Sequence, residues 1–203
     1  MWWNFRDVKG VGLAYWHPVT YRFIEKVLYG RSYRRHYEAL SREIGDLSLL
    51  ELCCGDCQIV DYLKGTTYQG LDINPRFVDH ARKRGLKVSL QDVMVSEIPE
   101  AQCILIHNSL YQFYPQHEKL IRRALESAQK KLIISEPVIN LASSKNRIVS
   151  FIAKRVTRVG EDSSSKRFNW REMEEIFGKF HADKIEFLGR NLMGVISKSY
   201  GER

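Results

Sequence analysis

Small and acidic residues follow two successive apolar stretches of the sequence, at a spacing suited to binding a nucleoside. The run Glu51-Leu52-Cys53-Cys54-Gly55-Asp56-Cys57 ends the first stretch, and Asp72 ends the second. Small residues after a strand let a ligand approach the backbone closely, and a carboxylate about 20 residues further on can accept hydrogen bonds from ribose hydroxyls. The pattern therefore predicts a binding site for a ribose-containing cofactor.

The elements expected to position these residues belong to an α/β domain. Apolar runs at 47–52, 68–71, 87–90, 103–106 and 131–134 alternate with helical patterns at 58–64, 75–84 and 115–128, as in βαβ units around a parallel sheet. Further on, Asn169 and Glu172 form a capping-box pattern that opens a helix to about Phe177. The runs at 184–188 and 192–197 predict a C-terminal hairpin. A parallel sheet finished by a hairpin contains one antiparallel strand.

The stretch Leu49 to Ile59, LLELCCGDCQI, resembles the first motif of class I S-adenosylmethionine (SAM)-dependent methyltransferases, an acidic residue followed by GxGxG. Glu51 takes the acidic position and Gly55 the central glycine position, whereas Cys53 and Cys57 stand where the flanking glycines usually lie. The run GLDINPRFVDHARKRG is similar to the second strand and helix of that family, and the resemblance covers about residues 46–197. It implies a Rossmann-like, seven-stranded, mostly parallel sheet with helices on both faces, and SAM as the cofactor.

The resemblance also implies a role for each residue around the cofactor. Glu51, Cys53 and Gly55 would form the turn, Asp72 would bind the ribose, Ile73 would cover the adenine, Asp92 and Val93 would lie at its amino group, and His107 would contact the cofactor. Two alternatives stay open, since Asp72 or Asn74 could cap the following helix and Asp92 could be an ordinary turn residue.

Chemistry at such a site needs few catalytic groups, because SAM carries its own electrophilic methyl group. A general base helps when the nucleophile is a hydroxyl, and His107 is the first candidate, with Tyr111 and His17 as weaker ones. Glu136, at the end of the fifth apolar run, could orient a substrate. No Asp/Asn-Pro-Pro-Tyr motif follows the fourth run, which argues against methylation of exocyclic amino groups of bases.

Composition limits the class of protein. With 203 residues, 44% hydrophobic and 28% charged, the chain suits one globular α/β domain. No apolar run is long enough to cross a membrane and no secretory signal is evident, so we expect a cytoplasmic protein. Three of the four cysteines crowd into positions 53–57 without a second ligand pair, which predicts reduced thiols and no metal site. The net charge of +8 suits an anionic partner or a merely solvated surface.

Two stretches lie outside the βα alternation and are candidate lids. Residues 1–45 would form an aromatic-rich helical cap, with helices at 18–28 and 33–44, on a SAM-binding domain spanning 46–203. Within that domain, 141–167 is a possible lid insertion containing a basic amphipathic helix at 144–158.

These features favour methyl transfer to a hydroxyl, amine or carbon of a small-molecule or lipid-like acceptor, which could be anionic or membrane-associated. An RNA methyltransferase is the first alternative, because of the basic segments. The others are a non-catalytic SAM-fold binding module and a nicotinamide dehydrogenase, for which the cysteine-rich turn is a poor GxGxxG.

Overall fold

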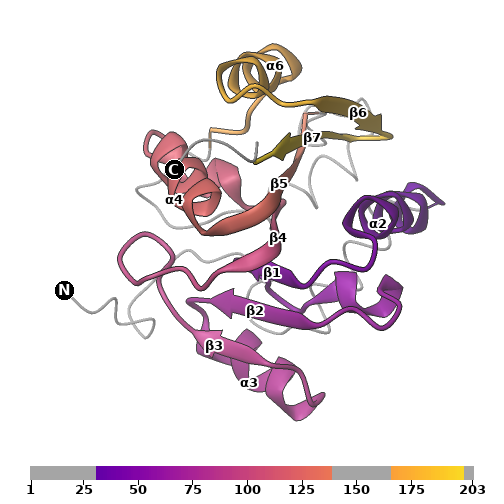
Figure 1. Cartoon of the computed structure of the whole chain (residues 1–203), viewed down its shortest axis with the longest axis vertical. Coiled ribbons are helices and arrows are strands. Elements are labelled where there is room, and N and C mark those ends of the chain that lie inside the picture. The colour runs from indigo at the N-terminus through magenta and orange to yellow at the C-terminus, as the bar shows by residue number, and fades with distance from the viewer. Residues whose placement is uncertain (1–30, 139–165, 199–203) are drawn as a thin grey trace, which may run out of the picture.

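A seven-stranded sheet lies at the centre of the part of the chain that the structure describes (Figure 1). The computed structural model describes residues 31–138 and 166–198. The strands are β1 (Leu49–Leu52), β2 (Tyr68–Asp72), β3 (Val88–Leu90), β4 (Ala101–His107), β5 (Ala128–Pro137), β6 (Lys184–Leu188) and β7 (Asn191–Ser197). Their order in the sheet is β3-β2-β1-β4-β5-β7-β6.

The sheet is mixed, with a single reversed strand. Neighbouring strands from β3 to β5 are parallel, while β7 is antiparallel to both β5 and β6. This confirms the predicted mostly parallel sheet with one antiparallel strand. The strand order changes direction between β1 and β4, and ligands of open α/β sheets bind beyond the carboxyl ends of strands at such a point.

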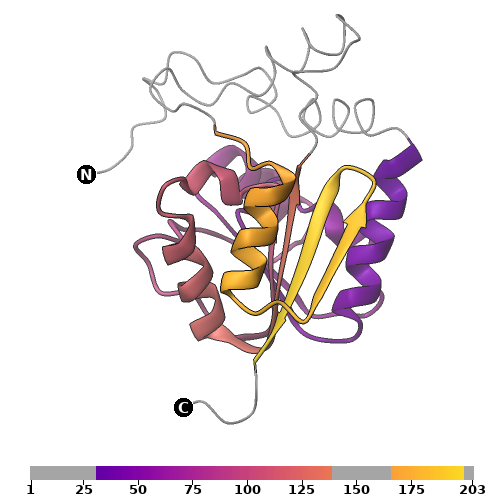
Figure 2. The ribbon, with the colours of Figure 1, turned by 90° about the horizontal axis from the view of Figure 1, so that it is seen from above.

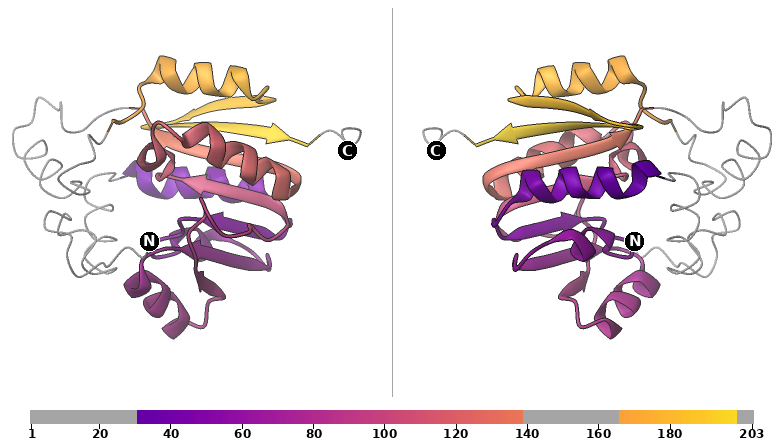
Figure 3. Two further views of the ribbon diagram at one scale, coloured as in Figure 1. Left: turned by 90° about the vertical axis from the view of Figure 1, so that its left-hand side faces the viewer. Right: turned by 90° about the vertical axis from the view of Figure 1, so that its right-hand side faces the viewer.

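Helices cover both faces of the sheet, as predicted. They are α2 (Arg31–Ile44), α3 (Pro75–Lys83), α4 (His117–Ser127), α6 (Trp170–Lys179) and the short 3₁₀ helices η2 (Gln58–Tyr62) and η3 (Leu110–Phe113). Figure 2 shows α2 on one side of the sheet and α4 and α6 on the other. In Figure 3, α3 lies at one end of the sheet, and α6 with the β6–β7 hairpin lies at the opposite end.

Alternation along the strands divides the core in two. Leu50, Leu52, Ile104, Ile106, Leu132 and Ile134 pack with α4 and α6, while Leu49, Cys103, Leu105 and Ile133 pack with α2. Successive side chains of a strand point to opposite faces, so one apolar run supplies both layers. Helix α2 contributes Tyr33, Tyr37, Leu40 and Ile44, one stripe at helical spacing. The part of the predicted cap that the structure describes is therefore packed on the sheet.

Some element boundaries differ from those predicted. Residues 58–64 form only the five-residue η2, because Leu63 is already extended and leads the chain to β2. Helix α4 begins at His117 rather than at Pro115, and it ends before Ala128, whose backbone is extended and opens β5. Strand β5 is longer than its apolar run, since it pairs with β4 on one side and β7 on the other.

The predicted caps are confirmed where the structure describes them. Asn169 and Glu172 form a reciprocal capping box at the start of α6, and the Asn74 side chain accepts from the Arg76 amide at the start of α3. The predicted helices at 18–28 and 144–158, His17, and all but the last two residues of the predicted lid at 141–167 lie outside the described residues. Of the helices that are described, none is long and apolar enough to span a membrane.

Candidate active site

The turn after β1 has alternating left-handed backbone conformations. Cys53, Gly55 and Cys57 have φ values of 56°, 52° and 55°. A left-handed backbone costs little for glycine, which has no Cβ, and is unfavourable for L residues. Glycine is therefore the expected residue at all three positions. The left-handed backbone at these positions explains why the GxGxG motif has glycines there. In this chain Cys53 and Cys57 adopt the same left-handed conformation.

Asp72 ties this turn to the end of β2. Its Oδ2 accepts from the Gly55 amide and its Oδ1 from the Asn74 amide, both at 2.8 Å. Burial raises the pKa of the Asp72 carboxyl, while these backbone amides oppose the shift. Asn74, not Asp72, caps α3, which removes the alternative role for Asp72. A carboxylate has about four lone-pair positions, so Asp72 keeps the capacity to accept from two hydroxyl groups.

Glu51 is buried beneath the turn. Its Oε2 accepts from the Tyr68 hydroxyl at 2.6 Å, and burial raises its pKa well above the usual range. The thiol of Cys57 interacts with the same Tyr68 hydroxyl and with Cys54. Glu51 therefore belongs to a polar network under the turn that fixes the turn against β2.

The three residues predicted to surround the adenine have different environments. Ile73 is 47% exposed, so an apolar surface is available beside Asp72. Asp92 is half-buried and its Oδ1 accepts from the Met94 amide at 2.8 Å, as in an ordinary Asx turn. Val93 is buried, and its carbonyl accepts from the Arg123 side chain at 3.0 Å. Asp92 retains a second carboxylate oxygen for a ligand.

His107, the last residue of β4, meets a second histidine from α2. The Nε2 atoms of His36 and His107 are 2.8 Å apart, and the ring centroids are separated by 4.8 Å. Burial lowers the pKa of His36 to about 4, and burial together with His36 lowers the pKa of His107 well below its usual range. Both rings are therefore neutral at pH 7, and one donates to the other.

The loop after β4 is held by Glu136 at the end of β5. Glu136 Oε1 accepts from the amides of Ser109 and Leu110, at 2.6 Å and 2.7 Å. Burial raises the pKa of Glu136 to about 7. Tyr111 is buried in the next turn, and the Arg167 guanidinium lies 3.6 Å from its ring centroid. The structure thus places Glu136 as a support of this loop.

His36, Tyr68 and Arg167 contact predicted site residues but were not themselves predicted. His36 shares a buried helix face with Tyr33, Tyr37 and Leu40, so the sequence marks it only as a polar residue on an apolar stripe. No local pattern in the sequence pairs Tyr68 with Glu51 or Arg167 with Tyr111.

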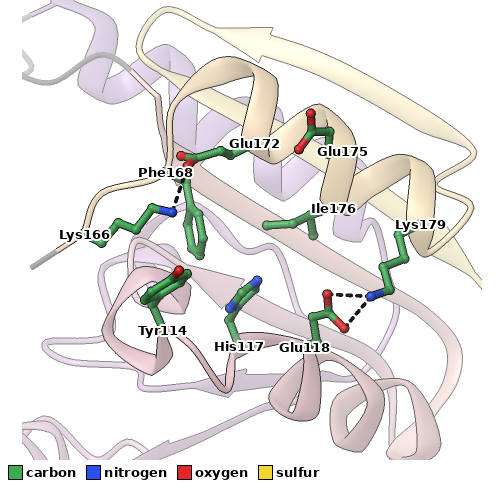
Figure 4. Close-up of a pocket in the computed structure, with 9 residues that line it drawn as sticks. All are labelled: Tyr114, His117, Glu118, Lys166, Phe168, Glu172, Glu175, Ile176 and Lys179. Carbon is green, nitrogen blue, oxygen red and sulfur yellow. Dashed lines mark hydrogen bonds and ion pairs between the residues drawn. The ribbon is translucent and has the colours of Figure 1, made fainter.

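A separate surface pocket of about 340 Å³ lies between α4 and α6 (Figure 4). It is lined by Tyr114, His117, Glu118, Lys166, Phe168, Glu172, Glu175, Ile176 and Lys179. Lys166 is paired with Glu172 at 3.0 Å and Lys179 with Glu118 at 2.7 Å. Of the residues predicted for cofactor binding or catalysis that the structure describes, none lines this pocket.

The cysteines form no disulfide in the structure. Cys53, Cys54, Cys57 and Cys103 are all free thiols. Within the described ranges, no three His, Cys, Asp or Glu side chains converge as metal ligands.

Comparison with known proteins establishes the fold class. No family model matches the chain, and no curated protein matches it. Among solved structures it is similar to a SAM-dependent methyltransferase of Thermotoga maritima, with 13% identity over 89% of this chain and 96% of that one and a TM-score of 0.62. The magnesium protoporphyrin IX methyltransferase ChlM of Synechocystis PCC 6803, solved with S-adenosylhomocysteine (SAH), has 12% identity over 89% and 95% and a TM-score of 0.60. The 16S rRNA methylase RmtB has 14% identity over 86% and 65% and a TM-score of 0.57.

The chain therefore has the Rossmann-like fold of class I SAM-dependent methyltransferases, which confirms the fold that the sequence resemblance implied.

Proposed function

We propose that this protein is a SAM-dependent methyltransferase acting on a small-molecule or lipid-like acceptor. The observation that carries the proposal is the link from Asp72 Oδ2 to the Gly55 amide, which joins a glycine-type turn to a buried carboxylate beside the switch point of a methyltransferase fold. Similar solved structures bind SAM or SAH, which supports the cofactor.

The proposed cofactor contacts follow the strand ends. Asp72 accepts from the ribose hydroxyls, Ile73 covers the adenine, and Asp92 and Val93 meet its amino end. The backbone at Cys53 and Gly55 contacts the part of the cofactor beyond the ribose. Glu51 does not touch the cofactor in this arrangement but holds the turn in place by accepting from the Tyr68 hydroxyl. When bound, SAM supplies the electrophilic methyl group, so the chain's task is to align the acceptor and exclude water.

Two side chains are proposed to act near the acceptor. His107 lies at the carboxyl end of β4, half-buried, and Tyr111 lies in η3 on the loop that Glu136 supports. Tyr111 is buried, the Arg167 guanidinium lies over its ring, and its hydroxyl accepts from the Gln112 side chain at 3.4 Å. His107 is consequently the stronger candidate for a contact with the methyl acceptor.

A paired substitution tests the cofactor site. Asp72→Asn replaces one acceptor oxygen by a donor, and we expect SAH affinity, measured by calorimetry, to fall at least about tenfold, or about 1.4 kcal/mol. Asp79→Asn on the exposed surface of α3 makes the same charge change and should leave affinity unchanged. Equal affinities of folded Asp72→Asn and wild-type protein would refute the assignment of Asp72.

RNA is the second candidate acceptor, favoured by the net charge of +8 and by the similarity to RmtB. Binding to RNA would weaken steeply with salt, because phosphate contacts release counterions. Fluorescence titration of RNA oligonucleotides at rising salt separates the two candidates, and no salt-dependent binding would exclude RNA.

A further inference from the structure

The contact between His36 and His107 constrains which nitrogen of each ring carries a proton. Two Nε2 atoms at 2.8 Å with both rings neutral require one Nε2–H donor and one Nε2 acceptor. A neutral imidazole that uses Nε2 as acceptor must carry its proton on Nδ1, and one that donates from Nε2 leaves Nδ1 as an acceptor. The choice of donor therefore fixes the tautomer of both residues.

The second nitrogen of His36 decides between the two arrangements. His36 is 3% exposed, and its Nδ1 is buried without a hydrogen-bond partner among the described residues. If His107 were the donor, His36 would carry a buried Nδ1–H with no acceptor, and orphaned buried N–H groups are rare because they lose their hydration. If His36 is the donor, only a lone pair stays unpartnered.

The surroundings hold the pair in this orientation. The Tyr37 ring lies edge-on to both imidazoles, with centroids 5.5 Å from His36 and 5.2 Å from His107. Tyr37 itself is buried and stacked on Tyr62. Rotation of either imidazole would disturb this packed aromatic cluster.

We propose that His36 is a positioning residue that donates from Nε2 to His107 and holds His107 as its Nδ1–H tautomer. His107 is half-buried, and its Nδ1 then offers a ligand a hydrogen-bond donor and not a base. The role of His107 toward a ligand rests on the proposed function, whereas the tautomer assignment does not. In this arrangement His107 orients a ligand by donating a hydrogen bond to one of its oxygen or nitrogen atoms. His107 does not act as a general base.

Nitrogen NMR of the full chain tests the tautomer directly and does not depend on methyl transfer. In protein with ¹⁵N-labelled histidine, long-range ¹H–¹⁵N spectra should show Nδ1 of His107 as protonated and Nε2 as unprotonated. For His36 we expect the reverse pattern. The signals are assigned by their loss in His107→Gln and His36→Gln. A protonated Nε2 on His107 would overturn the proposal.

Variants of His36 separate positioning from packing. His36→Leu removes the donor, so His107 should lose its fixed Nδ1–H pattern, whereas His36→Gln keeps a side-chain N–H donor and should retain more of it. His181, exposed between α6 and β6, serves as an internal reference and should not change. An unchanged His107 spectrum in folded His36→Leu would contradict the inference. If His36→Leu does not fold, the wild-type spectrum alone decides.

Failure of the proposed function gives a different result. Absence of SAH binding in calorimetry would remove the cofactor assignment but would leave the tautomer pattern of His107 as measured.

Discussion

Replacing Cys53 by glycine should stabilise the protein, although the change removes a side chain. Cys53 is half-buried and has a φ of 56°, a conformation that costs an L residue about 1–2 kcal/mol. Glycine loses about 0.5–1 kcal/mol of additional backbone entropy on folding. The difference predicts a gain of about 0.5–1 kcal/mol in the free energy of unfolding for Cys53→Gly.

Cys57→Gly is the matched control, because the backbone conformation is the same and the burial is not. Cys57 has a φ of 55° but is completely buried against Cys54, Val78 and Ala81. Loss of two buried heavy atoms costs about 1–2 kcal/mol, judging from small truncations in cores. This loss offsets the relief of backbone strain. We therefore expect the free energy of unfolding of Cys57→Gly to equal that of the wild type or to be lower by about 1 kcal/mol.

Urea denaturation of the 203-residue chain under reducing conditions measures the stability of both variants. The central expectation is the order of stability, with Cys53→Gly above wild type and Cys57→Gly at or below it. If Cys53→Gly were the less stable of the two variants, the left-handed strain assigned to the turn would be wrong. SAH affinity of Cys53→Gly should not fall, because glycine leaves the backbone at least as accessible to the cofactor.

Three further predictions concern stability. Burial raises the pKa of Glu136 from 4.5 to about 7, so between these pH values the folded chain keeps a proton that the unfolded chain releases. The free energy of unfolding should therefore fall by up to about 3 kcal/mol as the pH rises across this range. Glu136→Gln should remove that loss, so equal changes in unfolding free energy from pH 5 to pH 8 in both proteins would contradict it. Gly194→Ala should destabilise by about 1–3 kcal/mol, because its Cβ would lie 2.3 Å from the buried Phe177 ring. Gly178→Ala, in α6 with open space around it, should stabilise by up to about 1 kcal/mol in thermal unfolding.

The sequence predicts those parts of the fold that depend on local patterns. Short apolar runs locate the seven strands, and Asn169 with Glu172 locates the start of α6, because apolar runs and helix caps are local patterns. The short η2 was mistaken for a longer helix, since its residues are compatible with a helix and only the approach to β2 ends it. Propensity is a weak guide where a connection is this short.

The candidate site was predicted only for residues that follow a strand end in the sequence. Gly55 and Asp72 follow from motif spacing, and the structure brings them within hydrogen-bond distance. His36 and His107 are separated by 71 positions, and their contact exists only because α2 packs on the sheet beside β4. Glu136 was named only as a residue that could orient a substrate or have no role, and its contact with two loop amides through Oε1 follows from the sheet register rather than from any local pattern.

Calorimetric titration of the wild-type chain of 203 residues with SAM and with SAH tests the cofactor site most directly. We expect saturable binding of one molecule per chain, with a dissociation constant on the order of micromolar or tighter, about −8 kcal/mol. A chain that circular dichroism shows to be folded but that binds neither compound would contradict the assignment of this strand-end site to SAM.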